Sequence, residues 1–243
     1  MVDVVSINLG NKAHNVSVAQ QRIALERIKR HDAGVDVIVT QEARSRLITP
    51  VGYRSLPVVG GGASQVRIIV RKSLPVIGHG YLRAHPGKAH QWPARWLPMV
   101  TIDTPGLGAL TVIGLHINSS IEAAGKPVAI GPRMAYAFHN IDVAAELARF
   151  ARAELGHRVI VCGDTNVDAY ADRTVSHPKF PHARFRAAGL REAFPTVRSG
   201  THGDGPRRID RAFYSGGLDV SVRDLKRFAP YDHQPILIRA RKG

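Results

Sequence analysis

The chain has 243 residues, 44% of them hydrophobic and 22% charged, which suits one large globular domain or two small ones. Its 34 lysines and arginines exceed its 19 aspartates and glutamates, and the resulting net charge of +15 favours a polyanionic partner, nucleic acid before an anionic membrane surface. A general arginine bias without a specific partner is the alternative. The single cysteine, Cys162, excludes an internal disulfide, and the absence of a recognisable signal segment or membrane-spanning run predicts a soluble cytoplasmic protein.

The N-terminal third alternates between β-type and helical patterns. In chain order, it predicts strands over 3–9, 35–40 and 66–71 and a helix over 18–31. Asn8 falls near the end of the first strand, where a turn residue is the simplest interpretation. The second strand runs directly into Gln41 and Glu42. A carboxylate at the point where a buried strand opens out indicates a metal ligand, with a solvated loop glutamate as the alternative.

The middle of the chain predicts an exposed basic loop followed by a hairpin. Residues 78–91 contain several histidines, glycines and a proline, and their spacing does not match a zinc site. Strands are then expected over 95–101 and 110–117, joined across 105–108. The second of these strands delivers His116 and Asn118, which are two residues apart and therefore share a face. A buried polar pair satisfied by its neighbours is the alternative interpretation.

The C-terminal half predicts one long helix and several strands. Its expected elements are a loop over 119–131, a helix from Pro132 to about Leu155, strands over 158–163, 207–213, 220–228 and 235–240, and a mostly irregular segment over 170–205 with a short helix near 180–188. No repeat, linker or shift in composition marks a boundary. We therefore expect a single catalytic-type domain over residues 1–243.

The apolar run from Val159 to Val161 is the best-defined strand, and polar residues follow it closely. Gly163 ends the run, and Asp164 and Asn166 come next, so that both side chains can point into one cleft at the end of the strand. An acid and an amide there can hold a cation, a water molecule or a phosphate oxygen. An ordinary Asp/Asn turn is the alternative.

Polar residues thus follow predicted strands at five places, and the order of these places is characteristic. The residues that matter are Gln41-Glu42, Gly163-Asp164-Thr165-Asn166, Arg208-Ile209-Asp210 and Asp232-His233-Gln234-Pro235, with Asn8 and His116 in support. With these residues in this order, essentially the whole chain resembles the endonuclease/exonuclease/phosphatase superfamily. The resemblance implies an α/β fold, a four-layer αββα sandwich of two mixed β-sheets flanked by helices, with the site along one edge. It also implies cleavage of a phosphoester that depends on a divalent cation, Mg²⁺ or Mn²⁺.

The resemblance also assigns roles to individual residues. It implies that Glu42 is the principal metal-binding acid and that Asn8 and Asp232 are further metal-site residues. It implies that Asp210 and His233 form an acid–histidine pair, that Asp164 and Asn166 handle the attacking water and a phosphate oxygen, and that His116 is a second histidine of the site. Arg95, and Asn118 beside His116, are the implied substrate-binding residues. Positive charge and a positioned water are what a phosphodiester anion needs for hydrolysis. Whether His233 or Asp164 is the general base stays open.

We expect the substrate to be nucleic acid, DNA before RNA, because His116 is typical of the deoxyribonuclease, phosphatase and sphingomyelinase branches and the charge is broadly basic. The alternatives are a phosphatase of a small-molecule or lipid phosphate and a nucleic-acid-binding module without catalysis. Loops 78–91 and 170–208 are the expected footprint. The chain departs from the family pattern at Thr165 and Tyr231, which are usually a bulky apolar and a small residue. No obligate protein partner is indicated.

Overall fold

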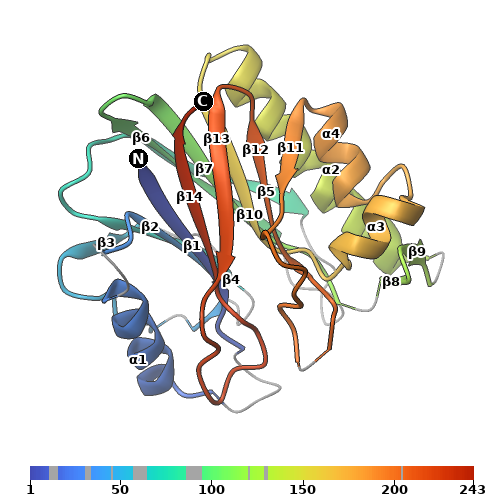
Figure 1. Cartoon of the computed structure of the whole chain (residues 1–243), viewed down its shortest axis with the longest axis horizontal. Coiled ribbons are helices and arrows are strands. Elements are labelled where there is room, and N and C mark those ends of the chain that lie inside the picture. Colours follow the sequence, from blue (N-terminus) through green and yellow to red (C-terminus); the bar gives the residue numbers. More distant parts are fainter. Residues whose placement is uncertain are drawn as a thin grey trace.

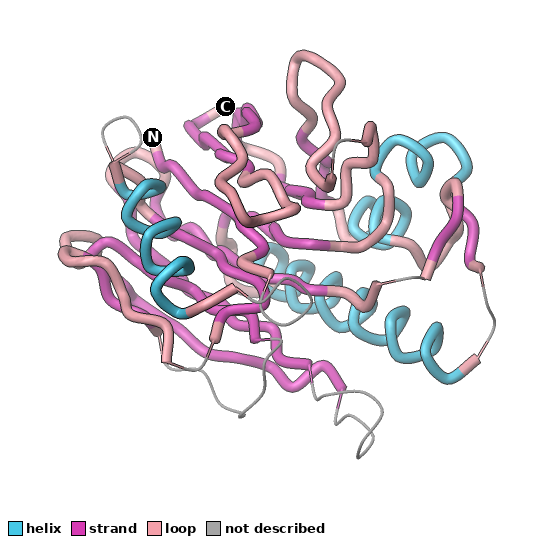
Figure 2. The backbone as a smooth tube through the Cα atoms, turned by 90° about the horizontal axis from the view of Figure 1, so that it is seen from below, coloured by secondary structure: helices cyan, strands magenta, loops and turns pink. Residues whose placement is uncertain are grey.

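Two six-stranded mixed sheets face each other, with helices on their outer faces (Figures 1 and 2). The computed structural model describes residues 1–10, 16–30, 34–44, 46–56, 65–85, 95–119, 121–128, 131–203 and 205–243. The first sheet has the spatial order β13 (Leu218–Asp224), β14 (Ile236–Lys242), β1 (Val2–Asn8), β2 (Val37–Ala43), β4 (Gln65–Arg71) and β3 (Tyr53–Ser55). The second has the order β11 (Leu190–Ala193), β12 (Asp210–Ser215), β10 (Arg158–Asp164), β7 (Gly108–His116), β6 (Arg95–Thr104) and β5 (Val76–His85).

The helices cover opposite sides of this pair of sheets. They are α1 (Val18–Lys29), α2 (Pro132–Ala153), α3 (Ala169–Val175) and α4 (Pro181–Ala187), and a small ribbon, β8 (Glu122–Ala123) and β9 (Lys126–Pro127), precedes α2. Helix α1 packs on the first sheet, whereas α2 and α4 pack on the second (Figure 1). The expected α/β sandwich is therefore confirmed. No helix in the described part of the chain combines the length and the apolar character that a membrane crossing requires.

The central strands are apolar in nearly every position because both of their faces are covered. In β10, Ile160 and Cys162 point into the core between the sheets, and Val159 and Val161 point toward α2. Burial raises the pKa of the Cys162 thiol to about 12, as expected for a core cysteine that is not a nucleophile. Strand β1 shows the same alternation between the inter-sheet core and the core beneath α1.

Strand register brings the ends of β7, β10 and β12 together. Strand β10 runs parallel to β7, which places Asp164 beside His116, and antiparallel to β12, which places Asp164 beside Asp210. In the other sheet, β1 runs parallel to β2 and pairs Asn8 with Gln41. Polar residues that lie far apart in sequence therefore converge on one edge of the sandwich.

Two segments expected to be loops are ordered. Residues 76–85 form β5, an edge strand paired with β6, so the loop prediction for 78–91 is wrong over 78–85; residues 86–91 lie outside the described residues. Glycines 78 and 80 disfavour a strand by themselves, but β6 supplies the hydrogen bonds, and Tyr81 packs edge-on against Trp96 at 5.4 Å. Tertiary pairing thus overrides local propensity here.

In the segment over 170–205, which was expected to be mostly irregular, α4 matches the short helix predicted near 180–188, whereas α3 and β11 were not predicted. Helix α3 is only seven residues long, and it begins where the Asp168 side chain accepts a hydrogen bond from the Tyr170 N–H. Its buried Asp172 is bonded to Arg211 at 2.7 Å. Such short elements depend on these side-chain anchors and carry little periodic signal. The segment over 119–131, also expected to be a loop, contains the β8–β9 ribbon.

Candidate active site

Asp210 and His233 form a buried hydrogen-bonded pair at the edge where the strands converge. The His233 Nδ1 atom lies 2.9 Å from Asp210 Oδ2, and its Nε2 atom lies 3.8 Å from Asp164 Oδ2. His233 is 6% exposed, Asp210 0% and Asp164 1%. The structure thus brings together the pair that the resemblance implied, with a second carboxylate on the other side of the ring.

Thr201 holds the segment that carries this pair. Its hydroxyl accepts hydrogen bonds from the N–H groups of Ile209 and Asp210 at 3.1 and 3.0 Å. Its carbonyl accepts from the Gln234 N–H at 2.7 Å, and the next residue, His202, bridges to His233 through the backbone. The start of β12 and the turn before β14 are therefore fixed to the same loop, which sets the distance between Asp210 and His233.

The sequence Gly163-Asp164-Thr165-Asn166 has a local structural reason at each position. Gly163 has φ of 152°, and a Cβ there would lie 1.9 Å from the Leu115 carbonyl oxygen, so only glycine fits. The Thr165 hydroxyl is fully buried and donates to the Ile209 carbonyl at 2.9 Å, which accommodates the departure from an apolar residue at this position. Asn166 has φ of 52°, a left-handed conformation that asparagine tolerates.

Asp164 is held by two amides. Its Oδ1 accepts from the Asn166 N–H at 2.8 Å, and its Oδ2 accepts from Asn8 Nδ2 at 2.9 Å. The Asn166 side chain donates in turn to the Ile117 carbonyl at 2.8 Å. Asn8 comes from the first sheet and Asp164 from the second, so this contact joins the two sheets at the site. It also leaves the Asp164 carboxylate with one fixed orientation.

His116 lies between the two acids expected to matter most. Its Nε2 is 3.7 Å from Asp164 Oδ2 and 3.8 Å from Glu42 Oε1. Its Nδ1 is 3.3 Å from Arg95 Nη1. Because a guanidinium can only donate, Nδ1 acts as the acceptor in that contact, and the ring proton belongs on Nε2, which faces the acids. Burial lowers the pKa of Arg95, although Tyr136 and Glu42 act in the opposite direction.

Glu42 is presented by an irregular end of β2. Its φ is 53°, and the pairing of β2 with β4 shifts register between Thr40 and Ala43. Gln21 on α1 supports this bulge by donating to the Glu42 carbonyl at 3.2 Å. The Glu42 side chain is 28% exposed, unlike the buried Asp164. Bulges of this kind redirect a side chain near a site, and here the result is an accessible carboxylate.

The remaining predicted residues occupy the margins of the cluster. Asn8 presents its Nδ2 to Glu42 Oε1 at 3.5 Å, while its Oδ1 accepts from the Gly10 N–H at 3.0 Å, so its amide would have to turn for Oδ1 to bind a metal. The Asp232 Oδ2 lies 3.4 Å from His202 Nε2. Asn118 is buried, and its Oδ1 has no hydrogen-bond partner among the described residues.

The buried charges perturb one another strongly. Burial raises the pKa of Asp164 to about 6, and the neighbouring Asp210 adds to this effect against the opposing influence of His233 and Asn8. Burial alone would lower the pKa of His233, but the Asp210 and Asp164 carboxylates outweigh it and raise that pKa to about 10. The arrangement therefore favours an imidazolium at His233, held between two acids.

Two residues of the cluster are missing from the sequence-based predictions. His202 stacks edge-on against His233 with ring centroids 4.9 Å apart, and Tyr136 is a buried partner of Arg95 on α2. His202 lies in the segment that was expected to be irregular, where nothing in the local pattern distinguishes it. The inward position of Tyr136 on a long helix was the only available signal.

The donor set fits a hard divalent cation. Ligand atoms of Asp164, Asp210 and His233 lie within 4.8 Å of one another, as do those of His202, Asp232 and His233. Asp210 Oδ1 is buried and lacks a hydrogen-bond partner in the described part of the chain, and the Glu42 carboxylate is accessible beside these groups. Carboxylate oxygens are the ligands that Mg²⁺ and Mn²⁺ prefer. The roles of the individual ligands stay predictions.

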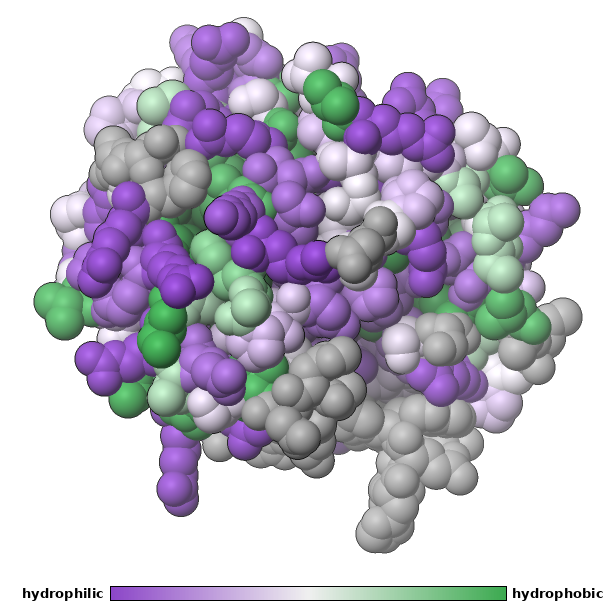
Figure 3. Space-filling model, turned by 60° about the horizontal axis from the view of Figure 1, so that its bottom comes forward, coloured by the Kyte–Doolittle hydropathy of each residue, from purple (hydrophilic) through white to green (hydrophobic). Residues whose placement is uncertain are grey.

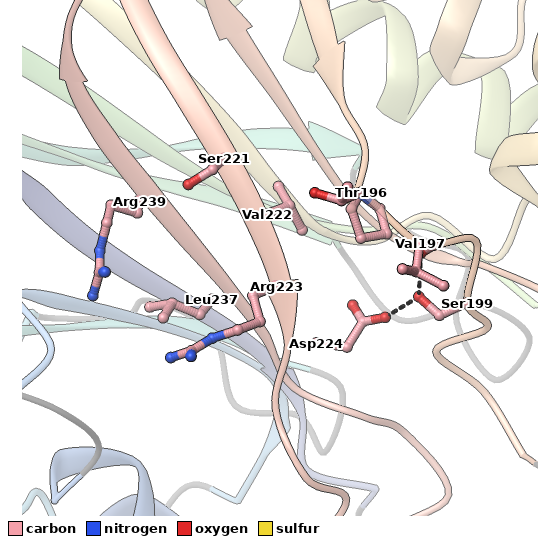
Figure 4. A pocket seen from close by; sticks show the side chains of 10 residues that line it. Thr196, Val197, Ser199, Ser221, Val222, Arg223, Asp224, Leu237 and Arg239 are labelled. Atoms are coloured by element: carbon pink, nitrogen blue, oxygen red, sulfur yellow. Dashed lines mark hydrogen bonds between the residues drawn. The ribbon is translucent and has the colours of Figure 1, made fainter.

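A separate pocket of about 480 Å³ contains none of these residues. It lies between the segment after β11 and the strands β13 and β14, and its walls include Val197, Ser199, Arg223 and Leu237 (Figure 4). The site thus occupies the edge of the sheets and not this pocket. Figure 3 views the molecule with the lower edge of Figure 1 turned forward, and hydrophilic side chains dominate that face.

The chain is similar to a known protein family and to several solved structures. The model of the Endonuclease/Exonuclease/phosphatase family matches residues 6–230. No curated protein matches the chain. Among solved structures, a mannosyl-6-phosphatase from Bacteroides thetaiotaomicron VPI-5482 is similar at a TM-score of 0.73 and 18% identity, with 99% of each chain covered.

Two further structures share the fold. Truncated TDP2 from Caenorhabditis elegans gives a TM-score of 0.67 at 17% identity, over 98% of this chain and 96% of that one. An endonuclease/exonuclease/phosphatase family protein from Leptotrichia buccalis C-1013-b gives 0.69 at 15% identity, over 99% of both chains. At these identities the likeness concerns the fold.

Proposed function

The chain belongs to the endonuclease/exonuclease/phosphatase family, and from this premise we propose that it is a divalent-metal-dependent phosphodiesterase that cleaves nucleic acid, DNA more readily than RNA. The observation that carries the proposal is the convergence of His116 and His233 on Asp164, with nitrogen–oxygen distances of 3.7 and 3.8 Å. One ring nitrogen from the end of β7 and one from the turn before β14 face the same carboxylate, which suits a place where a phosphate and a water sit together. The net charge of +15 supports a polyanionic substrate.

Each residue then has a defined task. Glu42 would hold a divalent cation, with Asp232 and, once its amide turns, Asn8 as further ligands; the cation would supply positive charge at the phosphate and would lower the pKa of a water. Asp164 orients the attacking water through its fixed carboxylate, and Asn166 faces a phosphate oxygen. General acid–base help of this kind contributes roughly 10²–10⁴-fold. The sequence left Asp164 and His233 as candidates for the base; because the imidazolium form is favoured at His233, we assign the base to Asp164 and phosphate binding to His233.

The other cationic and amide groups handle the phosphate. His233, with Asp210 behind it, presents Nε2 toward the reacting centre, and the Asp210 carboxylate fixes which ring nitrogen faces outward. His116 presents Nε2 from the neighbouring strand and is backed by Arg95. The buried Asn118 Oδ1 has no hydrogen-bond partner among the described residues, so this amide is a further candidate for a contact with the substrate.

A phosphatase of a soluble or lipid phosphate is the second candidate. It is favoured by the fold shared over 99% of both chains with a protein described as a mannosyl-6-phosphatase. A nucleic-acid-binding module without catalysis is the lesser candidate, and the intact set of acids and histidines at the strand ends argues against it.

One panel of substrates separates these candidates. The protein is incubated with supercoiled plasmid, single-stranded DNA, RNA, inositol phosphates and mannose 6-phosphate, in Mg²⁺ or Mn²⁺ and with or without EDTA. We expect metal-dependent cleavage of DNA that EDTA abolishes. Phosphate release from the small substrates with intact DNA would replace the proposal with the phosphatase, and binding of DNA without any turnover would replace it with the binding module.

A further inference from the structure

Between Asp168 and Arg207, two acids are buried whereas most of the described basic residues are exposed. Asp172 and Glu192 are buried against the Arg211 side chain, which is fully buried, at 2.7 and 2.6 Å. The exposed basic residues of the same segment are Arg173, Lys179, Arg186, Arg191, Arg198 and Arg207. Burying the acids leaves a surface that is strongly positive, which suits an anionic ligand.

Two of these arginines stack on aromatic rings in one continuous row. The Arg198 Cζ atom lies 4.3 Å from the Tyr170 ring centroid, the Tyr170 and Phe194 rings are 5.8 Å apart, and the Arg173 Cζ atom lies 4.9 Å from the Phe194 ring. We call these four residues the arginine–aromatic ladder. Each distance is within the range of a cation–π or aromatic contact.

The ladder is anchored from below. The Tyr170 hydroxyl donates to the Ser199 carbonyl at 3.2 Å and accepts from the Ser199 N–H at 3.0 Å. The Ser199 hydroxyl bonds to Asp224, which also pairs with the buried Arg208. Because the rings hold the guanidinium groups in place, an anion that binds them has less rotamer entropy to remove than at a free arginine.

The ladder begins close to the active site along two chain paths. Tyr170 follows Asn166 by four residues, and Arg198 precedes His202, which bridges to His233, by the same number. Consecutive Cα atoms are 3.80 Å apart, so each path spans at most about 15 Å. Figure 1 shows α3, which carries Tyr170 and Arg173, beside the end of the second sheet.

We propose that the arginine–aromatic ladder is a binding site for the sugar–phosphate backbone of a nucleic-acid strand whose scissile phosphate lies between His116 and His233. This inference rests on the proposed function and adds to it an extended substrate path on the α3 side. Guanidinium edges bind phosphate through paired hydrogen bonds, and their planes and the rings accept stacked bases.

The proposal predicts a dependence on substrate length. A stacked strand advances about 3.4 Å per nucleotide, so an interval of at most about 15 Å between site and ladder holds no more than roughly four nucleotides. Cleavage is therefore compared on a 12-nucleotide single strand and on bis(p-nitrophenyl) phosphate, for the wild type and for the double variant Arg173→Ala/Arg198→Ala. Both arginines are exposed, so the fold should be retained. Arg241→Ala, at the far end of β14, removes one exposed charge away from the ladder as the control.

We expect the double variant to raise KM for the 12-mer about tenfold, to leave turnover of the small diester unchanged, and to lower the slope of log affinity against log salt by about 1.5, since each lost phosphate contact contributes about 0.7–0.9. Arg173→Lys/Arg198→Lys should restore part of the loss, because charge returns without the planar fork. Equal losses in Arg241→Ala, or an equal loss on the small diester, would overturn the ladder as a subsite.

The two proposals fail separately. Fluorescence anisotropy of the labelled 12-mer in EDTA measures binding without turnover. If the wild type cleaves no nucleic acid but binds the 12-mer more tightly than the double variant, the nuclease assignment fails and the ladder stands. If the wild type cleaves the 12-mer and the double variant binds and cleaves it equally well, the ladder fails and the nuclease assignment stands.

Discussion

Removing either partner of the Asp210–His233 pair should cost activity, and the two losses should not add. Each single change, Asp210→Asn or His233→Ala, is expected to reduce turnover about 10²-fold or more, because the pair delivers one oriented imidazole. The double variant should be little worse than either single. A residue pair that acts as a unit can lose its contribution only once.

Stability should follow a different pattern because both side chains are buried. His233→Ala leaves the Asp210 carboxylate, which is 0% exposed, without its 2.9 Å partner. Stranding a buried charge costs about 3 kcal/mol or more, which for a chain of this size lowers the melting temperature by roughly 6–12 °C. Adding Asp210→Asn removes the stranded charge, so the double variant should be more stable than His233→Ala alone.

Plasmid nicking in Mg²⁺ measures the activities and calorimetry measures the unfolding, with all four proteins under the same conditions. Should plasmid prove not to be a substrate, the same cycle runs on whichever phosphoester is turned over. Activity losses that multiply in the double variant would refute the pairing as a catalytic unit. Melting temperatures that fall additively would refute the stranded-charge account.

Three further outcomes follow from the site and its support. Glu42→Gln should keep the fold but weaken Mg²⁺ binding and activity severely, and wild-type turnover at limiting Mg²⁺ would remove Glu42 from the metal site. His116→Ala should lose about 10²-fold in turnover, and full activity on every substrate would contradict the branch assignment based on that residue. Burial raises the pKa of Glu192, but Arg211 and His182 outweigh burial, so the net shift of this pKa is downward. The stabilisation that the Glu192 carboxylate gives the fold is therefore complete above its unfolded pKa and is lost as the pH falls through the lower folded value. The melting temperature gap between wild type and Glu192→Gln should therefore be wide at neutral pH and narrow in acid.

The sequence marks the strand ends that carry the candidate site residues better than it predicts how these residues are arranged relative to one another. Apolar runs followed at once by Glu42, His116 or Asp164 marked strand ends, because a strand covered on both faces must be apolar until it emerges. Which ends are neighbours depends on register between distant strands. Only the pairing of β10 with β7 and β12 sets Asp164 beside His116 and Asp210, and no local pattern encodes that pairing.

Segments stabilised by tertiary contacts were the ones misread. Strand β5 contains two glycines and mostly exposed positions, so its alternation is not apolar and it was expected to be a loop. Helix α3 depends on its Asp168 cap and on the bond from Asp172 to Arg211. The loop over 170–208 was predicted to contact nucleic acid and was expected to be mostly irregular, yet buried ion pairs hold it in place. His202 was missed for the same reason, since its proximity to His233 comes from a backbone bridge.

The arginines on either side of Asp210 are paired with other acids, which explains why the Asp210 carboxylate is available to bond His233. Arg208 and Arg211 are each 1% exposed, and either is close enough in sequence to neutralise Asp210. Each has another acid instead: Arg208 bonds to Asp224 at 2.9 Å, and Arg211 is bonded to the acids on α3 and β11. A bidentate arginine on Asp210 would hold it more strongly than a histidine does, and His233 would lose its orientation. The buried ion pairs around β12 therefore do more than stabilise the strand, since they leave the Asp210 carboxylate with one side-chain partner among the described residues, the imidazole that faces the proposed reaction centre.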